Sequence, residues 1–165
     1  MERLPYLAYG SNLLSARLAA RVGAVEVIAR ATLPGYTLRF NKRGRDGSGK
    51  CTLVAQAGAT AYGVVYALPI AARGELDRIE GLGRGYEATH VKVPTVGECY
   101  VYLAQDGWTD DALAPYDWYR DLVVAGAREH GLPAAYVAAI AAVAARPDPD
   151  AARAADHRAL IAGPR

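Results

Sequence analysis

Strand-like and helix-like patterns occupy different parts of this sequence, and their separation limits the fold more than any other feature. Runs such as "TAYGVVYAL" and "ECYVYLA", typical of β-strands, dominate the first hundred residues. From Pro115 onward, apolar residues recur at helical spacing instead. Strands followed by helices favour an α+β fold over an alternating α/β one. We therefore predict a small barrel-like sheet of mixed strand direction, with flanking helices and a helical C-terminal segment.

The patterns also place the individual elements along the chain. Expected strands cover residues 5–9, 26–33, 36–42, 51–56, 60–68, 87–96 and 98–104, with a turn at Pro34-Gly35 and a hairpin turning at Gly97. Expected helices cover residues 11–22, 70–82, 116–130, 133–145 and 148–162, the last of them peripheral. A length of 165 residues suits one domain, so we predict a single domain over residues 1–165.

Composition and charge exclude several classes of function. With 52% hydrophobic and 22% charged residues, the chain is typical of a globular protein. A net charge of +2 gives no electrostatic case for binding nucleic acid or an anionic membrane. We see no signal peptide and no apolar segment near 18 residues, so we expect a cytoplasmic protein. Cys51 and Cys99 have no metal-ligand spacing and are expected to be free thiols, although a disulfide between them stays open.

Two further patterns look chemical but do not predict a site. "GRDGSGK", residues 44–50, fits most of a phosphate-binding P-loop, but Cys51 follows where Ser or Thr is needed. A strand-like run also follows where a P-loop requires a helix, so we expect a hairpin loop. His90, His130 and His157 form no metal pattern. We therefore predict no metal site.

The stretch "YLAYGSNLLSARL", residues 6–18, places a polar, turn-forming tripeptide between a buried strand and a helix start. Gly10 allows a tight turn. Free N–H groups from Gly10 to Leu13 would then meet the positive end of the helix dipole, which is a common anion site. An ordinary helix cap made by Ser11 or Asn12 explains the same residues equally well. As a nucleophile Ser11 is not expected, because the G-x-S-x-G pattern is missing.

A second polar residue with an unusual position is Glu80, in "ELDRIEGLGRGYEATHV". It ends an expected helix just before Gly81, where the helix dipole disfavours an anion by roughly 0.3–1 kcal/mol. This unfavourable position suggests that the carboxylate is kept for chemistry, and a glutamate in a pocket can act as a general base. Glu87 is the rival carboxylate, but it begins a strand and lacks the following glycine.

Four segments together resemble the γ-glutamylcyclotransferase family. They are "YLAYGSNL", "YGVVYAL", "LDRIEGLGRGY" and "WYRDLVVAGAREHGLPAAY", which occur in the order of the family and span most of residues 5–140. The resemblance implies a barrel-like α+β fold with a pocket at one end. "NKRGRDGSGKCTLVAQ" departs from the family pattern. We expect this loop to face the pocket and to bear on the choice of leaving group.

The resemblance implies an enzyme that works by intramolecular aminolysis, without cofactor or metal. The α-amine of a γ-glutamyl amide attacks its own γ-carbonyl and releases 5-oxoproline and a free amine or amino acid. Glu80 would be the acid and base of this reaction. The residues implied in substrate binding are Tyr9, Gly10, Ser11, Asn12, Leu13, Tyr86 and Tyr119, the last of which suits a helix core equally well. The partner is a small γ-glutamyl substrate, and a homodimer stays open.

Two alternatives remain at this point. The same chemistry could remove a γ-glutamyl protecting group from a natural-product amine or a carrier-linked acyl chain, with the basic loop of Lys42, Arg43, Arg45 and Lys50 meeting an acidic carrier protein. A non-catalytic small-molecule binding domain of the same fold is the other alternative. Glu80 argues against it, because a domain that only binds has no need of an acid at that position.

Overall fold

A five-stranded sheet and five α-helices make up the fold, in a computed structural model that describes residues 1–163. The strands are β1 (Arg3–Ala8), β2 (Glu26–Arg43), β3 (Gly49–Pro69), β4 (Tyr86–Val93) and β5 (Gly97–Ala104). The helices are α1 (Ser15–Val22), α2 (Ile70–Glu80), α3 (Asp117–Glu129), α4 (Ala134–Ala141) and α5 (Ala151–Ala162), with a 3-10 turn η1 (Ser11–Leu13) before α1.

The sheet is mixed and open, with the strand order β2-β3-β1-β5-β4. Strands β1 and β5 run parallel, and the other neighbouring pairs are antiparallel. The mixed α+β class is therefore confirmed. Its barrel-like curvature does not lead to a closed barrel, because no pairing joins β2 to β4 among residues 1–163.

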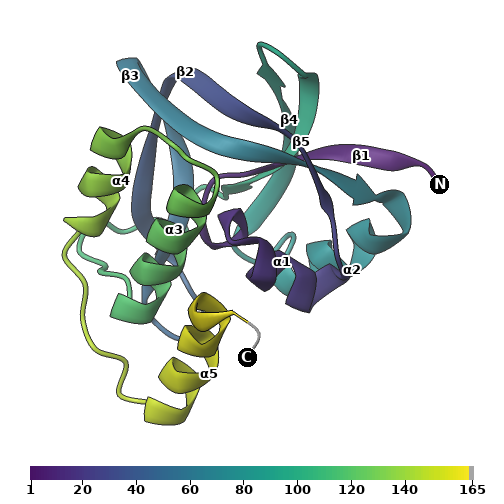
Figure 1. Ribbon diagram of the computed structural model, residues 1–165. Helices are drawn as coiled ribbons and strands as arrows, with labels where there is room; N and C mark the ends of the chain where they lie inside the picture. Colours follow the sequence, from purple (N-terminus) through teal and green to yellow (C-terminus); the bar gives the residue numbers. More distant parts are fainter. Residues whose placement is uncertain (164–165) are drawn as a thin grey trace.

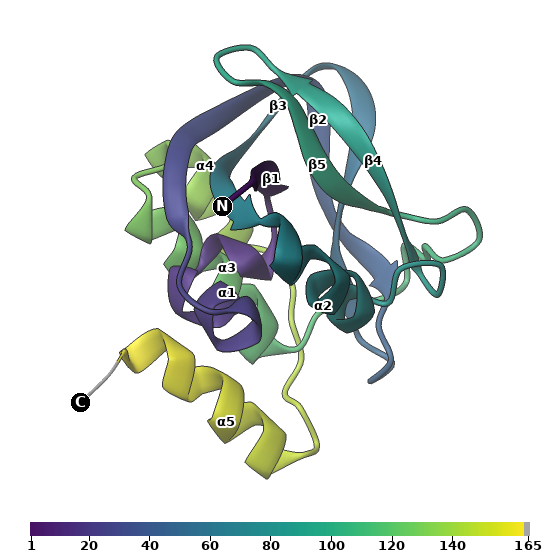
Figure 2. The ribbon, with the colours of Figure 1, turned by 90° about the vertical axis from the view of Figure 1, so that its right-hand side faces the viewer.

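The helices collect on one side of the curved sheet (Figures 1 and 2). Helix α3 contacts η1 and both later helices, and α5 lies on the outer side of α1 and α3. The buried apolar side chains form one connected core between sheet and helices, and Leu7, Leu18, Val65 and Leu122 are each at most 1% exposed. Within residues 1–163, no helix is long and apolar enough to cross a membrane.

The long strands correct one part of the sequence prediction. The turn expected at Pro34-Gly35 is wrong, because β2 continues through it and only a shift of register occurs between Pro34 and Tyr36. The partner strand β3 likewise runs unbroken through the two strands expected at 51–56 and 60–68. Gly35 has a φ of +82°, so the glycine allows an irregularity within the strand where a turn was expected.

The helix expected at residues 11–22 is also corrected. It is divided at Leu14, whose ψ of 113° is extended, into the 3-10 turn η1 and the helix α1. Most other elements agree with the prediction within a few residues, including the β4–β5 hairpin and the helix α3, which ends at Glu129 shortly before Gly131. The segment after residue 44 leads directly into β3, so the P-loop reading is excluded, and Cys51 and Cys99 are free thiols.

Candidate active site

The loop after β1 is fixed in place by the helical half of the chain. The carbonyl of Leu13 accepts hydrogen bonds from the Tyr66 hydroxyl at 2.7 Å and from His130 Nε2 at 2.8 Å. A Cβ added to Gly126 of α3 would lie 2.4 Å from the Leu14 nitrogen, so only glycine lets the helix approach this closely. The loop therefore takes its position from α3 and β3 as well as from its own turn.

Glu80 reaches the same place from the end of α2. Gly81 follows it with a left-handed φ of +75°, which ends the helix, and the Leu82 N–H closes the cap on the Asp77 carbonyl at 2.9 Å. The Glu80 side chain is only 14% exposed. The carboxylate is thus turned into the molecule instead of into solvent.

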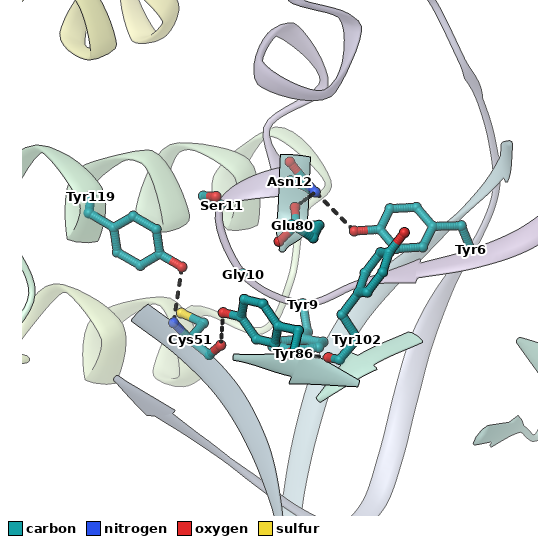
Figure 3. Close-up of a pocket in the computed structure, with 10 residues that line it drawn as sticks. All are labelled: Tyr6, Tyr9, Gly10, Ser11, Asn12, Cys51, Glu80, Tyr86, Tyr102 and Tyr119. Atoms are coloured by element: carbon teal, nitrogen blue, oxygen red, sulfur yellow. Dashed lines mark hydrogen bonds between the residues drawn. The ribbon is translucent and has the colours of Figure 1, made fainter. Parts of the chain in front are cut away.

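One oxygen of the Glu80 carboxylate is held by two donors. Its Oε1 accepts from Asn12 Nδ2 at 2.9 Å and from Arg21 Nη1 at 2.7 Å. The Asn12 amide also donates to the Tyr6 hydroxyl at 2.9 Å (Figure 3). Within residues 1–163, Oε2 takes part in no hydrogen bond. The carboxylate is therefore oriented through one oxygen while the other is available to a ligand.

Glu80 and the loop meet in one pocket, which Figure 3 shows. Its lining residues are Tyr6, Tyr9, Gly10, Ser11, Asn12, Cys51, Glu80, Tyr86, Tyr102 and Tyr119. Glu80 is the only carboxylate in this lining, as far as the described chain shows.

Five tyrosines form the walls of the pocket, and burial keeps their hydroxyl groups neutral. Desolvation is the largest cause that raises the pKa of Tyr9, Tyr86 and Tyr119 well above the ordinary value. The Tyr86 hydroxyl donates to the Cys51 carbonyl at 2.6 Å, and the Tyr119 hydroxyl accepts from the Cys51 N–H at 3.0 Å. These bonds fix both rings against β3 and give the pocket a rigid wall.

The remaining candidate nucleophile in the lining is Cys51, and its environment makes it inert. Burial raises the pKa of its thiol to about 12, so the thiolate is scarce at neutral pH. The side chain is also pressed against the loop, since a Cβ on Gly10 would lie 2.9 Å from the Cys51 Cβ. The pocket therefore offers acid–base chemistry by a carboxylate and no covalent nucleophile.

The structure brings together most of the residues singled out from the sequence. Tyr9, Gly10, Ser11, Asn12, Glu80, Tyr86 and Tyr119 all line the pocket. Leu13 does not: it is fully buried below the loop, and the Gly10 carbonyl accepts its N–H at 3.0 Å. The structure therefore does not bring Leu13 into the pocket, and this residue anchors the loop. Glu87 is exposed on β4 and lies outside the lining.

The physical basis expected for an anion site changes as well. The helix dipole cannot act at Ser11, because α1 begins only at Ser15 and η1 is a single turn. In the described part of the chain, no group accepts a hydrogen bond from the N–H of Gly10, Ser11 or Asn12. Those donors are free because they lie at the start of the single 3-10 turn η1, and the dipole of α1 does not direct them.

Sequence reasoning missed Tyr6, Tyr102 and Arg21. Tyr6 and Tyr102 lie on β1 and β5, and neither strand pattern tells which face covers the pocket. Arg21 lies near the end of the first expected helix, where a polar residue is usually on the surface. In the structure its side chain forms an ion pair with Glu80. The one signal was the unfavourable position of the Glu80 carboxylate at the end of α2, which indicates that a cation should lie near it.

Comparison with known proteins gives consistent matches. The family described as AIG2-like matches residues 60–140. A human γ-glutamylcyclotransferase is 31% identical over 145 residues, which are 82% of this chain and 76% of the human protein. The bovine γ-glutamylcyclotransferase is 30% identical over 142 residues, with the same shares covered. A solved structure titled γ-glutamyl cyclotransferase superposes with a TM-score of 0.85 at 26% identity, covering 98% of this chain and 100% of that one.

Proposed function

Because this chain belongs to the γ-glutamylcyclotransferase family, we propose that it converts a γ-glutamyl amide into 5-oxoproline and a free amine. The nucleophile is the substrate's own α-amine, and the electrophile is the γ-carbonyl carbon of the same molecule. Holding both ends of one flexible chain in reacting geometry supplies much of the acceleration, since such positioning can contribute roughly 7–11 kcal/mol. The protein then has to fold the substrate and move protons.

The observation that carries this proposal is that only one of the two oxygens of the Glu80 carboxylate is hydrogen-bonded. Oε1 is fixed by Asn12 and Arg21, while Oε2 has no partner among residues 1–163. The carboxylate is therefore oriented before the substrate binds. It can accept a proton on Oε2 without breaking a hydrogen bond to the protein. The neutral tyrosines around it cannot compete for that proton.

The proton steps balance through this one group. Glu80 takes a proton from the substrate's α-ammonium, and the free amine attacks the γ-carbonyl carbon to form the ring nitrogen–carbon bond. Glu80 then delivers a proton to the leaving nitrogen as its bond to the γ-carbon breaks. The ring nitrogen gives up its second proton to Glu80 in the same way, and Glu80 passes this proton to the departing amine. The lactam therefore keeps one hydrogen on nitrogen, and the amine leaves as an ammonium ion. Because the nucleophile belongs to the substrate and Glu80 moves only protons, the reaction needs no covalent enzyme intermediate.

The loop supplies what the substrate's charged end requires. The free N–H groups of Gly10, Ser11 and Asn12 are the donors in the pocket suited to the α-carboxylate. The tyrosine walls exclude water and confine the methylene chain in a folded shape. This arrangement supports an amide whose acyl part is glutamyl and whose amine part extends out of the pocket.

The test is product identification by mass spectrometry. γ-Glutamyl-alanine and γ-glutamyl-lysine are incubated with the protein, and 5-oxoproline together with the free amino acid is expected. α-Glutamyl-alanine is the matched control, because its alanine is attached to the α-carbonyl. Release of glutamate in place of 5-oxoproline would make the protein a hydrolase. Saturable binding without turnover of either compound would favour the non-catalytic binding domain.

A further inference from the structure

A second and larger cavity opens directly beside the pocket, and we name it the vestibule. It shares Ser11, Glu80, Tyr86 and Tyr119 with the pocket, so the two spaces meet at the carboxylate. Its outer part is built by the segment 42–50, which departs from the family pattern in sequence. An amine that leaves from beside Glu80 has this space in front of it.

The vestibule is strongly cationic. Seven basic side chains and two carboxylates line it, an excess of five positive charges in a chain whose net charge is +2. Both carboxylates are already paired: Glu80 with Arg21 at 2.7 Å, and Asp46 with Lys50 at 2.9 Å. The other five cations have no carboxylate within ion-pair distance anywhere in residues 1–163. Positive charge is thus concentrated on one concave surface, which attracts anions.

Lys42 is the most informative of these unpaired cations. Its residue is only 6% exposed, and its Nζ lies 4.1 Å from the centre of the Tyr86 ring. No acceptor in the described chain takes a hydrogen bond from this ammonium. The absence of a side chain at Gly85 makes space for the Lys42 ammonium, because a Cβ on Gly85 would lie 2.8 Å from Nζ. Because Lys42 lines the vestibule and its ammonium has no carboxylate partner among residues 1–163, this charge is available to an anionic ligand in the cavity.

Arg17 is a second buried cation in the lining of the vestibule. It is 7% exposed, its Nε donates to Ser11 Oγ at 2.9 Å, and Nη1 lies 3.0 Å from His157 Nδ1. Both partners are neutral groups, since burial and the nearby arginines lower the pKa of His157 to about 4. Arg17 is therefore a second buried positive charge with no direct ion pair among residues 1–163.

We propose that the vestibule selects γ-glutamyl amides whose leaving amine carries at least two negative charges, such as an acidic amino acid or a phosphorylated one. The inference rests on the proposed function and adds the class of leaving group. One α-carboxylate can pair with a single cation. The two buried cations and the exposed basic side chains of the vestibule can therefore bind a second anionic group as well. A small ligand is favoured over an acidic carrier protein, because carboxylates on a folded protein surface do not reach Lys42 and Arg17.

Matched substrates that differ by one ionised group test this selection. We compare kcat/KM for γ-glutamyl-glutamate with γ-glutamyl-glutamine, and for γ-glutamyl-phosphoserine with γ-glutamyl-serine. A hydrogen-bonded charge pair predicts a preference of about 10- to 100-fold for the more acidic member of each pair. The two pairs separate a carboxylate from a phosphate preference. The preference should also shrink as salt is added.

A pair of variants identifies the residue responsible. Lys42→Met keeps the apolar stem but removes the ammonium, and it should reduce the preference for the acidic substrate by about 10-fold or more. Lys92→Met removes a positive charge from an exposed position on β4 and should leave the preference unchanged. Equal kcat/KM for both members of each pair in the unmodified protein would overturn the inference while leaving the cyclotransferase function standing. Absence of 5-oxoproline from all four substrates would overturn both.

Discussion

Replacing Gly126 by alanine tests how the catalytic loop is held. The new methyl group would lie 2.4 Å from the Leu14 nitrogen and 2.6 Å from the Leu13 carbonyl carbon. Optimal separations between such atoms are about 3.5–4.0 Å, so loop and helix must separate by about 1 Å. Both contacted atoms belong to a backbone that Tyr66 and His130 also hold, so the strain cannot be relieved by a side-chain rotation.

Two effects of this substitution oppose each other. Alanine is preferred to glycine inside a helix by about 1 kcal/mol. Overpacking costs about 1–3 kcal/mol, and we expect the upper end here because backbone is displaced. The net loss of about 2 kcal/mol corresponds to a Tm lower by about 4–8 °C for a domain of this size. Activity should fall by about 100-fold, because a displacement of this order misplaces Asn12 and the loop donors.

Gly74→Ala is the matched control, since it makes the same substitution inside helix α2. A Cβ on Gly74 would meet no atom within 4 Å. Helix preference then acts alone, and the free energy of unfolding should rise by about 0.5–1 kcal/mol with activity unchanged. Thermal unfolding and the cyclisation assay are measured on both variants. If Gly126→Ala is as stable and as active as the unmodified protein, the close contact does not position the loop.

Two further predictions concern buried polar groups. Because the pKa of His157 is held at about 4, below its ordinary 6.5, the unfolded chain binds a proton first as the pH falls. The unmodified protein should therefore lose Tm relative to His157→Phe, which does not titrate, between about pH 6.5 and 4, and a difference that is constant with pH would refute this. Tyr119→Phe leaves the buried Cys51 N–H without its acceptor and should cost about 1–3 kcal/mol in chemical denaturation. Tyr36→Phe, at a half-buried tyrosine outside the pocket lining, should cost much less, and equal losses in the two variants would contradict the assignment.

The sequence predicts those parts of the fold that local chemistry determines. Pro69 and Gly81 bound α2 as expected, because proline suits a helix start and a left-handed glycine suits its end. The turn at Pro34-Gly35 failed for a physical reason. The same residues suit a turn or a bulge, and only the pairing with β3, whose partner residues lie about twenty positions away or more, decides between them.

The candidate site divides in the same way. Glu80 and the Gly10–Asn12 loop carry local signals, an acid at a helix end and a polar turn after a buried strand. Arg21, Tyr6 and Tyr102 carry none, because their roles arise only when α1, β1 and β5 meet around the pocket. The helix expected from residue 11 is interrupted at Leu14, which leaves Leu13 buried outside the pocket lining, and no propensity argument predicts that break.

The most direct test of the central claim is the cyclisation rate of Glu80→Gln. The amide keeps the shape of the side chain and can still accept from Asn12 and Arg21, but it cannot take the α-ammonium proton. Turnover should fall by about 10²–10⁴-fold while the substrate still binds. Glu87→Gln, at an exposed position on β4, should keep nearly full activity. Formation of 5-oxoproline by Glu80→Gln at the rate of the unmodified protein would contradict the account, because Glu80 would then have no part in moving the proton.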